Sequence, residues 1–194
     1  MEYPIGATPL DPDEMAGLLI LAVETRADLD EVEQTNIQAG FKWLAKQRKY
    51  SGLDCLSMEF ARELHQQLFG QVWSWAGQFR LTEKNIGIDP RHIATQLMNA
   101  LADAQVWHEQ STYSRLEYAA RLHHKLVFIH PFANGNGRWA RILTDVVLEQ
   151  VLATEPIDWG RGLLSISEHR RNYLDALRAA DRQDFSLLKA FMSE

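Results

Sequence analysis

Apolar residues recur at helical spacing along most of the chain and predict a bundle of amphipathic helices. Over residues 29–46 they return every three to five positions, which is typical of one buried helix face. A second helix is expected between an N-cap at Ser57 and a stop at Gly70. Capping boxes that begin at Ser114 and Ser165 mark two later starts. The same spacing predicts further helices over residues 91–109, 116–128, 138–152, 168–180 and 185–192.

Two segments break this helical period. Residues 1–17 hold three of the six prolines and several acids, and they predict an extended arm. The run FRLTEKNIGIDP, residues 79–90, carries a glycine and an Asp-Pro pair, which predict two short extended pieces around a turn. The expected fold class is therefore all-α, with seven to eight helices around one core and one short β-hairpin.

Composition narrows the class of protein. A chain of 194 residues with 46% hydrophobic content can bury one full core. Its net charge of −6 argues against nucleic acid as the main partner. Cys55 is the single cysteine, so no intrachain disulfide is expected. Because the chain opens without a basic start and has no long apolar run, the sequence predicts a cytoplasmic protein without a membrane contact.

One loop carries candidate chemistry, in the run FIHPFANGNGRWAR. Asn134, Gly135 and Asn136 favour loop conformations, and they precede Gly137 and a new amphipathic helix. Glycines let the backbone approach a ligand, and the first amides of a helix are unpaired donors at its positive end. The loop therefore predicts a cradle for an anion.

Charged residues flank this cradle. Arg138 and Arg141 lie in the first turn of the following helix, where the dipole disfavours cations unless an anion is bound. Two arginines there suggest a polyphosphate ligand. His130 ends the preceding helix and is fixed by Pro131, so it is a candidate general base at the rim. By residue type alone, a plain helix-loop-helix corner with a packed histidine and a solvated arginine face remains an alternative.

The spacing of HPFANGNGRWAR closely resembles the signature of the Fic family, His-x-Phe-x-(Asp/Glu)-Gly-Asn-Gly-Arg-x-x-Arg. The resemblance continues in ELHQQLFGQVWSWAGQFR, NIGI and YLDALRAADRQDFSLLKAF, and it covers roughly residues 55–192. The order of elements is similar to the bacterial Fic proteins called mobile mystery protein B. The resemblance implies a Fic domain over residues 55–194, with an arm and helix over residues 1–54 packed on it.

This resemblance implies a protein adenylyltransferase, which moves AMP from ATP to a Ser, Thr or Tyr hydroxyl. His130 would be the catalytic base, and Phe132 would anchor the loop in the core. Asn136 would help to hold the α-phosphate, and Arg141 would hold the γ-phosphate. The implied nucleotide-binding set is Asn134, Gly135, Asn136, Gly137, Arg138 and Arg141.

Two loop positions bear on the reaction that the resemblance implies. Asn134 stands where active members usually carry an acid that binds Mg²⁺, and a neutral amide oxygen is a weaker ligand. The expectation is that Asn134 contacts the metal weakly while the phosphates supply most of the ligand charge. The related kinase Doc carries a lysine where this chain has Gly137, so Gly137 favours AMP transfer over phosphate transfer.

The segment after Arg80 resembles the target flap of the family, an extended edge that pairs with a stretch of the target protein. The alternative is an ordinary surface hairpin. The expected flap residues are Leu81, Thr82, Glu83, Lys84, Asn85, Ile86, Gly87 and Ile88.

Regulation and rival functions follow from the same resemblance. Many members are inhibited by a helix with Ser/Thr-x-x-x-Glu-(Gly/Asn), whose glutamate pairs with the second motif arginine, here Arg141. The chain has no clean copy of that pattern, so a separate antitoxin-like inhibitor is expected. The rival functions are a catalytically weak Fic-fold binding module and Fic-type transfer of another phosphate-containing group.

Overall fold

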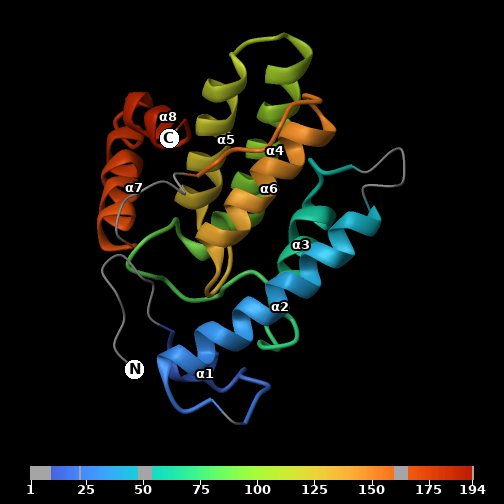
Figure 1. Ribbon diagram of the computed structural model, residues 1–194, viewed down its shortest axis with the longest axis vertical. Coiled ribbons are helices and arrows are strands. Elements are labelled where there is room, and N and C mark those ends of the chain that lie inside the picture. Colours follow the sequence, from blue (N-terminus) through green and yellow to red (C-terminus); the bar gives the residue numbers. More distant parts are fainter. Residues whose placement is uncertain (1–9, 22, 48–53, 160–165, 194) are drawn as a thin grey trace.

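The computed structural model describes residues 10–21, 23–47, 54–159 and 166–193, and helices dominate it (Figure 1). Helices α4, α5 and α6 run side by side, α2 packs on α3, and α7 and α8 cover one flank of α5. The predicted all-α fold is confirmed. The elements are α1 (Pro12–Met15), α2 (Arg26–Gln47), α3 (Met58–Phe69), a short 3-10 helix η1 (Pro90–His92), α4 (Ile93–Glu109), α5 (Arg115–Ile129), α6 (Asn136–Gln150), α7 (Ile166–Ala180) and α8 (Ser186–Phe191).

Local capping chemistry accounts for some helix ends. Ser57 is the N-cap of α3, and its hydroxyl accepts a hydrogen bond from the amide of Phe60 at 3.1 Å, as predicted. The predicted capping box at Ser114 is wrong, because its side chain makes no capping bond. Its partner Glu117 instead pairs with Lys189 at 2.6 Å. The other predicted cap, Ser165, lies outside the described residues.

The N-terminal part of the chain packs on the rest. Described residues of the arm include the short helix α1, and the amide of Ser74 donates to the carbonyl of Gly17 at 2.9 Å. On α2, the side chain of Asn36 donates to Gln67 O at 3.1 Å and accepts from Gln71 N at 2.8 Å. These bonds fix α2 against the end of α3. The division into an arm over residues 1–54 and a domain over residues 55–194 stays a prediction.

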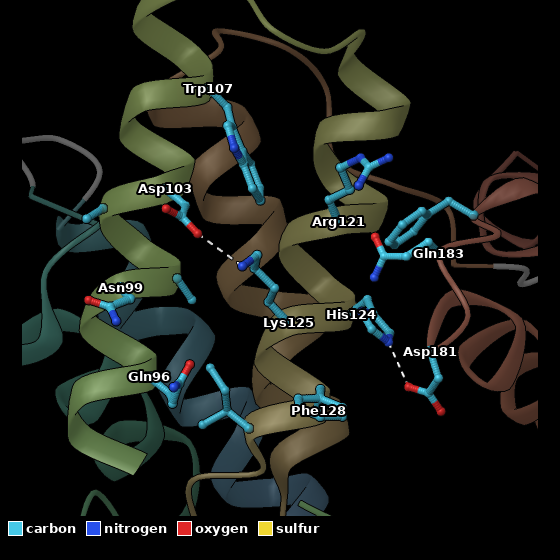
Figure 2. Close-up of a pocket in the computed structure, with 14 residues that line it drawn as sticks. Gln96, Asn99, Asp103, Trp107, Arg121, His124, Lys125, Phe128, Asp181 and Gln183 are labelled. Carbon is cyan, nitrogen blue, oxygen red and sulfur yellow. Dashed lines mark hydrogen bonds and ion pairs between the residues drawn. The ribbon is translucent and has the colours of Figure 1, made fainter. Parts of the chain in front are cut away.

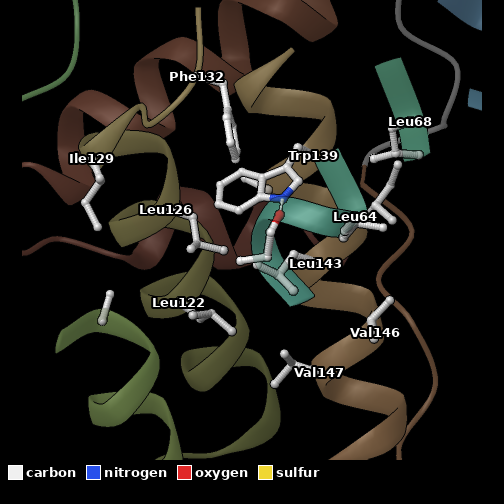
Figure 3. Packing of buried hydrophobic residues seen from close by; sticks show 14 of the residues in the cluster. Leu64, Leu68, Leu122, Leu126, Ile129, Phe132, Trp139, Leu143, Val146 and Val147 are labelled. Atoms are coloured by element: carbon white, nitrogen blue, oxygen red, sulfur yellow. Dashed lines mark hydrogen bonds between the residues drawn. The ribbon is translucent and has the colours of Figure 1, made fainter. Parts of the chain in front are cut away.

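The core surrounds Trp139, whose side chain is fully buried on α6 (Figure 3). Its indole N–H donates to the carbonyl of Ala61 at 2.8 Å, which ties α6 to α3. The ring of Phe132 meets the indole edge to face at a centroid distance of 5.0 Å. Phe132 is also fully buried, as expected for an apolar anchor. The core therefore fixes both sides of the candidate loop.

The β-hairpin predicted over residues 79–90 is absent, and the described residues contain no strand. The reason lies in Arg80, whose side chain donates to Thr82 O at 2.8 Å and to Ile88 O at 2.5 Å. The guanidinium thus takes the place of the backbone amides that would otherwise bond these carbonyls in a ladder. The flap is an irregular loop closed around one arginine.

No helix among the described residues combines the length and apolarity that crossing a bilayer requires.

We expect Trp139→Ala to lower the free energy of unfolding by about 3–5 kcal/mol, because it leaves a large cavity and removes the hydrogen bond to the Ala61 carbonyl. Urea denaturation measures the change. Met98→Ala serves as the control, since Met98 is 54% exposed and should cost only about 0.5 kcal/mol. A cost below about 1 kcal/mol for Trp139→Ala would contradict this assignment of the core.

Candidate active site

The loop between α5 and α6 has a left-handed residue at each end. His130 has φ 51° and ψ 61°, and Gly135 has φ 76°. A Cβ on Gly135 would lie 2.7 Å from the ring of Phe69, so both the conformation and the space require glycine. A left-handed histidine costs roughly 1–2 kcal/mol. Surrounding contacts must therefore hold this turn.

Arg80 supplies several of those contacts and is nearly fully buried. Its Nε donates to the carbonyl of His130 at 2.7 Å, and its backbone amide donates to Pro131 O at 2.9 Å. A third bond, from Nη2 to Ile129 O, is longer at 3.4 Å. Together with its bonds to the flap, these make Arg80 the link between the flap and the loop.

The second half of the loop is held by two polar side chains. The side chain of Asn136 spans the turn. Its Nδ2 donates to Phe132 O at 2.8 Å, and its Oδ1 accepts from Phe132 N at 2.9 Å. His65 of α3 donates from Nε2 to Asn134 O at 3.0 Å and accepts from Gly77 N at Nδ1. Full burial lowers the pKa of His65 to about 3, so the ring is neutral and can serve both roles.

These contacts turn the loop carbonyls toward the protein. The amides of Asn136, Gly137 and Arg138 open helix α6, where they lack intrahelical acceptors. The space beside Gly137 is open, since the nearest atom to an added Cβ is the Tyr173 hydroxyl at 4.0 Å. The result is a positively polarised backbone segment of the kind that binds phosphate oxygens.

Arg138 meets a buried acid that the sequence pattern missed. Glu33 of α2 is fully buried and pairs with the guanidinium of Arg138 at 2.7 Å. Its other oxygen accepts from the indole N–H of Trp73 at 2.7 Å. This pair differs from the inhibitory contact of the family. The inhibitory glutamate there pairs with the second motif arginine, here Arg141, whereas Glu33 pairs with the first, Arg138. An anion that enters the cradle must therefore compete with Glu33 for Arg138.

Arg141 lies against aromatic rings on the other side. Its guanidinium carbon is 4.4 Å from the ring centroid of Tyr173 and 5.8 Å from that of Trp159. Its Nε is buried without a hydrogen-bond partner. The Tyr173 hydroxyl lies 2.9 Å from Nε2 of the fully buried His123, which is a packing histidine. Arg141 is thus oriented by stacking on two aromatic rings.

His130 lies at the rim, 5% exposed. Burial, opposed in part by a bond to Val127 O and assisted by the charges of Arg80 and Lys84, lowers the pKa of its imidazole to about 4. The ring is therefore neutral at pH 7. A tautomer that donates from Nδ1 to Val127 O, at 3.4 Å, has its acceptor nitrogen at Nε2.

The flap lies directly over this histidine. A Cβ on Gly87 would come within 2.6 Å of His130 Cβ, and Gly87 has φ 101°. Lys84 is buried and pairs with Asp11 at 2.8 Å and with Glu14 of α1. The flap is therefore tied both to the loop and to the N-terminal arm.

Asn134, the predicted metal residue, turns its side-chain oxygen back to the Gly135 amide at 2.6 Å. Among the described residues no group of three His, Cys, Asp or Glu side chains could hold a metal ion. A single neutral oxygen that already accepts a hydrogen bond does not form a magnesium site. The chain alone therefore does not fit a resident Mg²⁺.

A cavity of about 680 Å³ lies elsewhere, between α4, α5 and the turn from α7 to α8 (Figure 2). Some of its polar side chains pair with one another: Lys125 contacts Asp103 at 3.0 Å, and His124 contacts Asp181 at 2.9 Å. None of the predicted site residues lines it. The candidate chemistry belongs to the loop and not to this cavity.

The predicted loop residues thus lie together, and the predicted flap covers His130. Sequence reasoning missed four polar residues that complete the site, namely Glu33, His65, Arg80 and Tyr173. His65, Arg80 and Tyr173 fall within the runs that carry the family resemblance, so those runs signalled them. Glu33 had no such signal, because its contact with Arg138 depends on how α2 packs.

Comparison with known proteins points to one family. The sequence model of the Fic/DOC family matches residues 55–148. The protein adenylyltransferase Fic of Culex quinquefasciatus is 29% identical over 145 residues, which cover 73% of this chain and 28% of that protein. The protein adenylyltransferase fic-1 of Caenorhabditis elegans is 33% identical over 103 residues, which cover 49% of this chain and 20% of that protein. This chain spans less than a third of the length of these relatives.

Solved structures share the fold. Fic-1 from C. elegans superposes with a TM-score of 0.68 at 24% identity, covering 91% of this chain and 51% of that one. The N-terminal Fic domain of a Bartonella effector protein from Bartonella sp. AR 15-3 gives 0.69 at 18% identity, covering 89% and 83%. The relatives found by sequence are animal proteins, so they lend no support to a bacterial toxin–antitoxin setting. The mobile mystery protein B subgroup stays a prediction.

We expect Glu33→Gln to strengthen the binding of inorganic pyrophosphate by several-fold to about tenfold, because Arg138 loses its competing carboxylate. The glutamine oxygen can still accept from Trp73, so the helix contact is kept. Isothermal titration calorimetry measures the affinity. Glu31→Gln, an exposed position on the same helix, removes the same charge and should change little. Equal effects of the two variants would contradict a specific competition.

Proposed function

Because residues 55–148 form a domain of the Fic/DOC family, we propose that this chain is a protein adenylyltransferase that moves AMP from ATP to a Ser, Thr or Tyr hydroxyl of a target protein. The observation that carries the proposal is the loop, which joins a neutral imidazole at its first residue to unpaired backbone amides and two arginines at the start of α6. The named activity of the curated relatives agrees with this proposal. Because this chain spans less than a third of the length of those relatives, the proposal is argued from the residues of the site.

His130 is the proposed general base. The imidazole accepts the proton of the target hydroxyl as the hydroxyl oxygen forms a bond to the α-phosphorus. The bond from the α-phosphorus to the oxygen of the β-phosphate breaks, and pyrophosphate leaves with that electron pair. A pKa of about 4 keeps the ring unprotonated at pH 7 but makes it a weak base. A bound polyanion would raise that pKa toward the optimum.

The loop amides are the proposed phosphate ligands. Those of Asn136, Gly137 and Arg138 would bond oxygens of the α- and β-phosphates, and Arg138 would neutralise the charge that develops there. The Asn136 side chain is engaged with Phe132, so we assign it to holding the loop and assign phosphate contact to its backbone amide. Arg141 would hold the γ-phosphate. Gly137 leaves room for the chain of phosphates.

The flap is the proposed contact for the target protein. Residues 81–88 pass over His130, and Leu81 is 91% exposed at the start of this segment. A target segment that pairs with the exposed flap backbone would bring its hydroxyl to the imidazole. This binding mode does not require a preformed strand.

Magnesium is proposed to arrive with ATP instead of residing in the chain. The metal supplies charge neutralisation between the phosphates once it is bound. The Asn134 amide oxygen is the predicted protein contact, and it would have to leave the Gly135 amide to bind the metal. Most of the ligand charge would therefore come from the nucleotide, consistent with a weak protein contact.

Regulation is proposed to involve Glu33. Its pairing with Arg138 keeps one phosphate ligand occupied by a carboxylate of the same chain. A separate antitoxin-like inhibitor stays an additional prediction.

A catalytically weak binding module is the main alternative function, since Asn134 replaces the metal carboxylate. Transfer of another phosphate-containing group is the second alternative.

Labelling separates these functions. We expect ATP labelled at the α-phosphate to label a protein in cell lysate or the chain itself, and ATP labelled at the γ-phosphate to label neither. Intact-mass analysis should show the added mass of one AMP. His130→Asn should lower the labelling by about 10²–10⁴-fold, because it removes the base. Asparagine tolerates the left-handed backbone at this position, so the loop should persist.

Labelling by the γ-phosphate alone would contradict AMP transfer and would show that the chain transfers phosphate. Absence of both labels with intact ATP binding would favour the binding module.

Asn134→Asp tests the metal. A carboxylate restores a charged oxygen ligand, so we expect it to lower the Mg²⁺ concentration needed for half-maximal AMP transfer by several-fold. The measurement is initial rate against Mg²⁺ at fixed ATP. Asn134→Ala controls for loss of the bond to Gly135 and should not lower that concentration. An unchanged Mg²⁺ dependence in Asn134→Asp would sink the proposed contact.

A further inference from the structure

The N-terminal arm meets the predicted target flap through a buried ion pair. Lys84 lies in the middle of the flap, and its side chain is only 3% exposed. Its ammonium group pairs with Asp11 at 2.8 Å and also contacts the carboxylate of Glu14 on α1. Because a lysine is seldom buried unless its charge is paired, these two acids account for the position of Lys84.

A second flap residue contacts the same acids. The Thr82 hydroxyl lies 3.0 Å from Asp11 Oδ2 and 3.3 Å from Glu14 Oε1. The two acids are themselves held together, since the amide of Asp11 donates to Glu14 Oε2 at 2.8 Å. The start of the arm therefore presents one preformed pair of carboxylates to the flap.

The arm that carries these acids is fixed on the turn that leads to the flap. The indole N–H of Trp75 donates to Glu14 O at 2.9 Å, and the amide of Leu19 donates to Val72 O at 2.9 Å. The packing is close, because a Cβ on Gly17 would lie 2.5 Å from the Trp75 ring. The two acids are therefore held by the protein and do not depend on the flap for their position.

Arg80 and the arm hold different parts of the flap. The Arg80 side chain bonds to Thr82 O and Ile88 O, so it fixes the two ends of the segment. Lys84 lies between those ends and ties the middle to the arm. Residues 81–88 contain no strand, and each ordered residue loses conformational entropy, so such contacts must supply the order. The arm therefore helps to set the shape of the flap over His130.

We propose that Asp11 and Glu14 are positioning residues for the target protein. Through Lys84 they keep the flap ordered over His130 before a target segment pairs with it. This inference rests on the proposed function, which assigns the flap to target binding. An ordered flap loses less conformational entropy when the target binds, so the arm strengthens target binding. Because the arm holds the flap and the nucleotide binds the loop, nucleotide affinity should be spared.

Hydrogen exchange of the full chain, measured by mass spectrometry, tests the contact directly. Glu14→Gln removes one carboxylate charge from Lys84, so the amides of residues 81–88 should exchange about tenfold faster or more. The amides of α6 should stay within about twofold of wild type. Asp13→Asn is the matched control and should leave the flap unchanged, because Asp13 is exposed on the same helix and loses the same charge.

A double-variant cycle shows whether the two sides act through one contact. Lys84→Met removes the charge from the flap and keeps a long side chain in the buried position. If Glu14 acts through Lys84, the double variant exchanges its flap amides no faster than the faster of the two single variants. Additive acceleration would overturn the role of this ion pair.

Enzyme assays connect the arm to the target. Transfer of label from the α-phosphate of ATP is measured against increasing lysate concentration, and isothermal titration calorimetry gives the AMPPNP dissociation constant. Glu14→Gln should raise the half-saturating lysate concentration by about tenfold. It should change the saturating rate and the AMPPNP dissociation constant by less than about twofold. A general loss of structure would change all three quantities.

The contrary results are distinct. If Glu14→Gln leaves flap exchange at the level of Asp13→Asn, or accelerates exchange in α6 equally, the arm does not position the flap, and the proposed function stands. If the flap loosens while the half-saturating lysate concentration is unchanged, the role in target binding is overturned. If the wild type labels no protein, the proposed function is overturned instead, and hydrogen exchange still decides whether the arm orders the flap.

Discussion

The site depends on one constraint, the orientation of the loop carbonyls between α5 and α6. Arg80 holds the carbonyl of His130, the Asn136 side chain holds that of Phe132, and His65 holds that of Asn134. These three bonds fix the backbone of the turn that leads into α6. The unpaired amides of the first turn of α6 are therefore held in place, and phosphate oxygens bind well at such a helix start.

This constraint also links the acid–base groups of the site to its packing. His65 can bridge Gly77 and Asn134 only while it is neutral, and burial keeps its pKa near 3. His130 is kept neutral by the same cause, with Arg80 beside it. Cations that orient the loop thus also keep the proposed base unprotonated. Glu33 acts in the opposite direction to these cations, because its carboxylate lowers the local positive charge at Arg138.

Much of this arrangement could be predicted from the sequence, and the exceptions have physical causes. Helical periodicity located α2 to α8 because each buries one face, and the loop motif located the cradle because its chemistry is local. The hairpin was wrong because a side chain, Arg80, replaces the backbone ladder. Glu33 escaped notice because its contact with Arg138 comes from packing between α2 and α6, which no local pattern encodes.

The most direct test of the cradle is the amide spectrum of isotope-labelled protein titrated with AMPPNP. If the loop binds phosphates, the largest changes in NMR chemical shift fall on the backbone amides of Gly135 to Arg138. The pKa of the His130 imidazole also rises on binding. Changes confined to the cavity between α4 and α5, with the loop amides unmoved, would contradict the account.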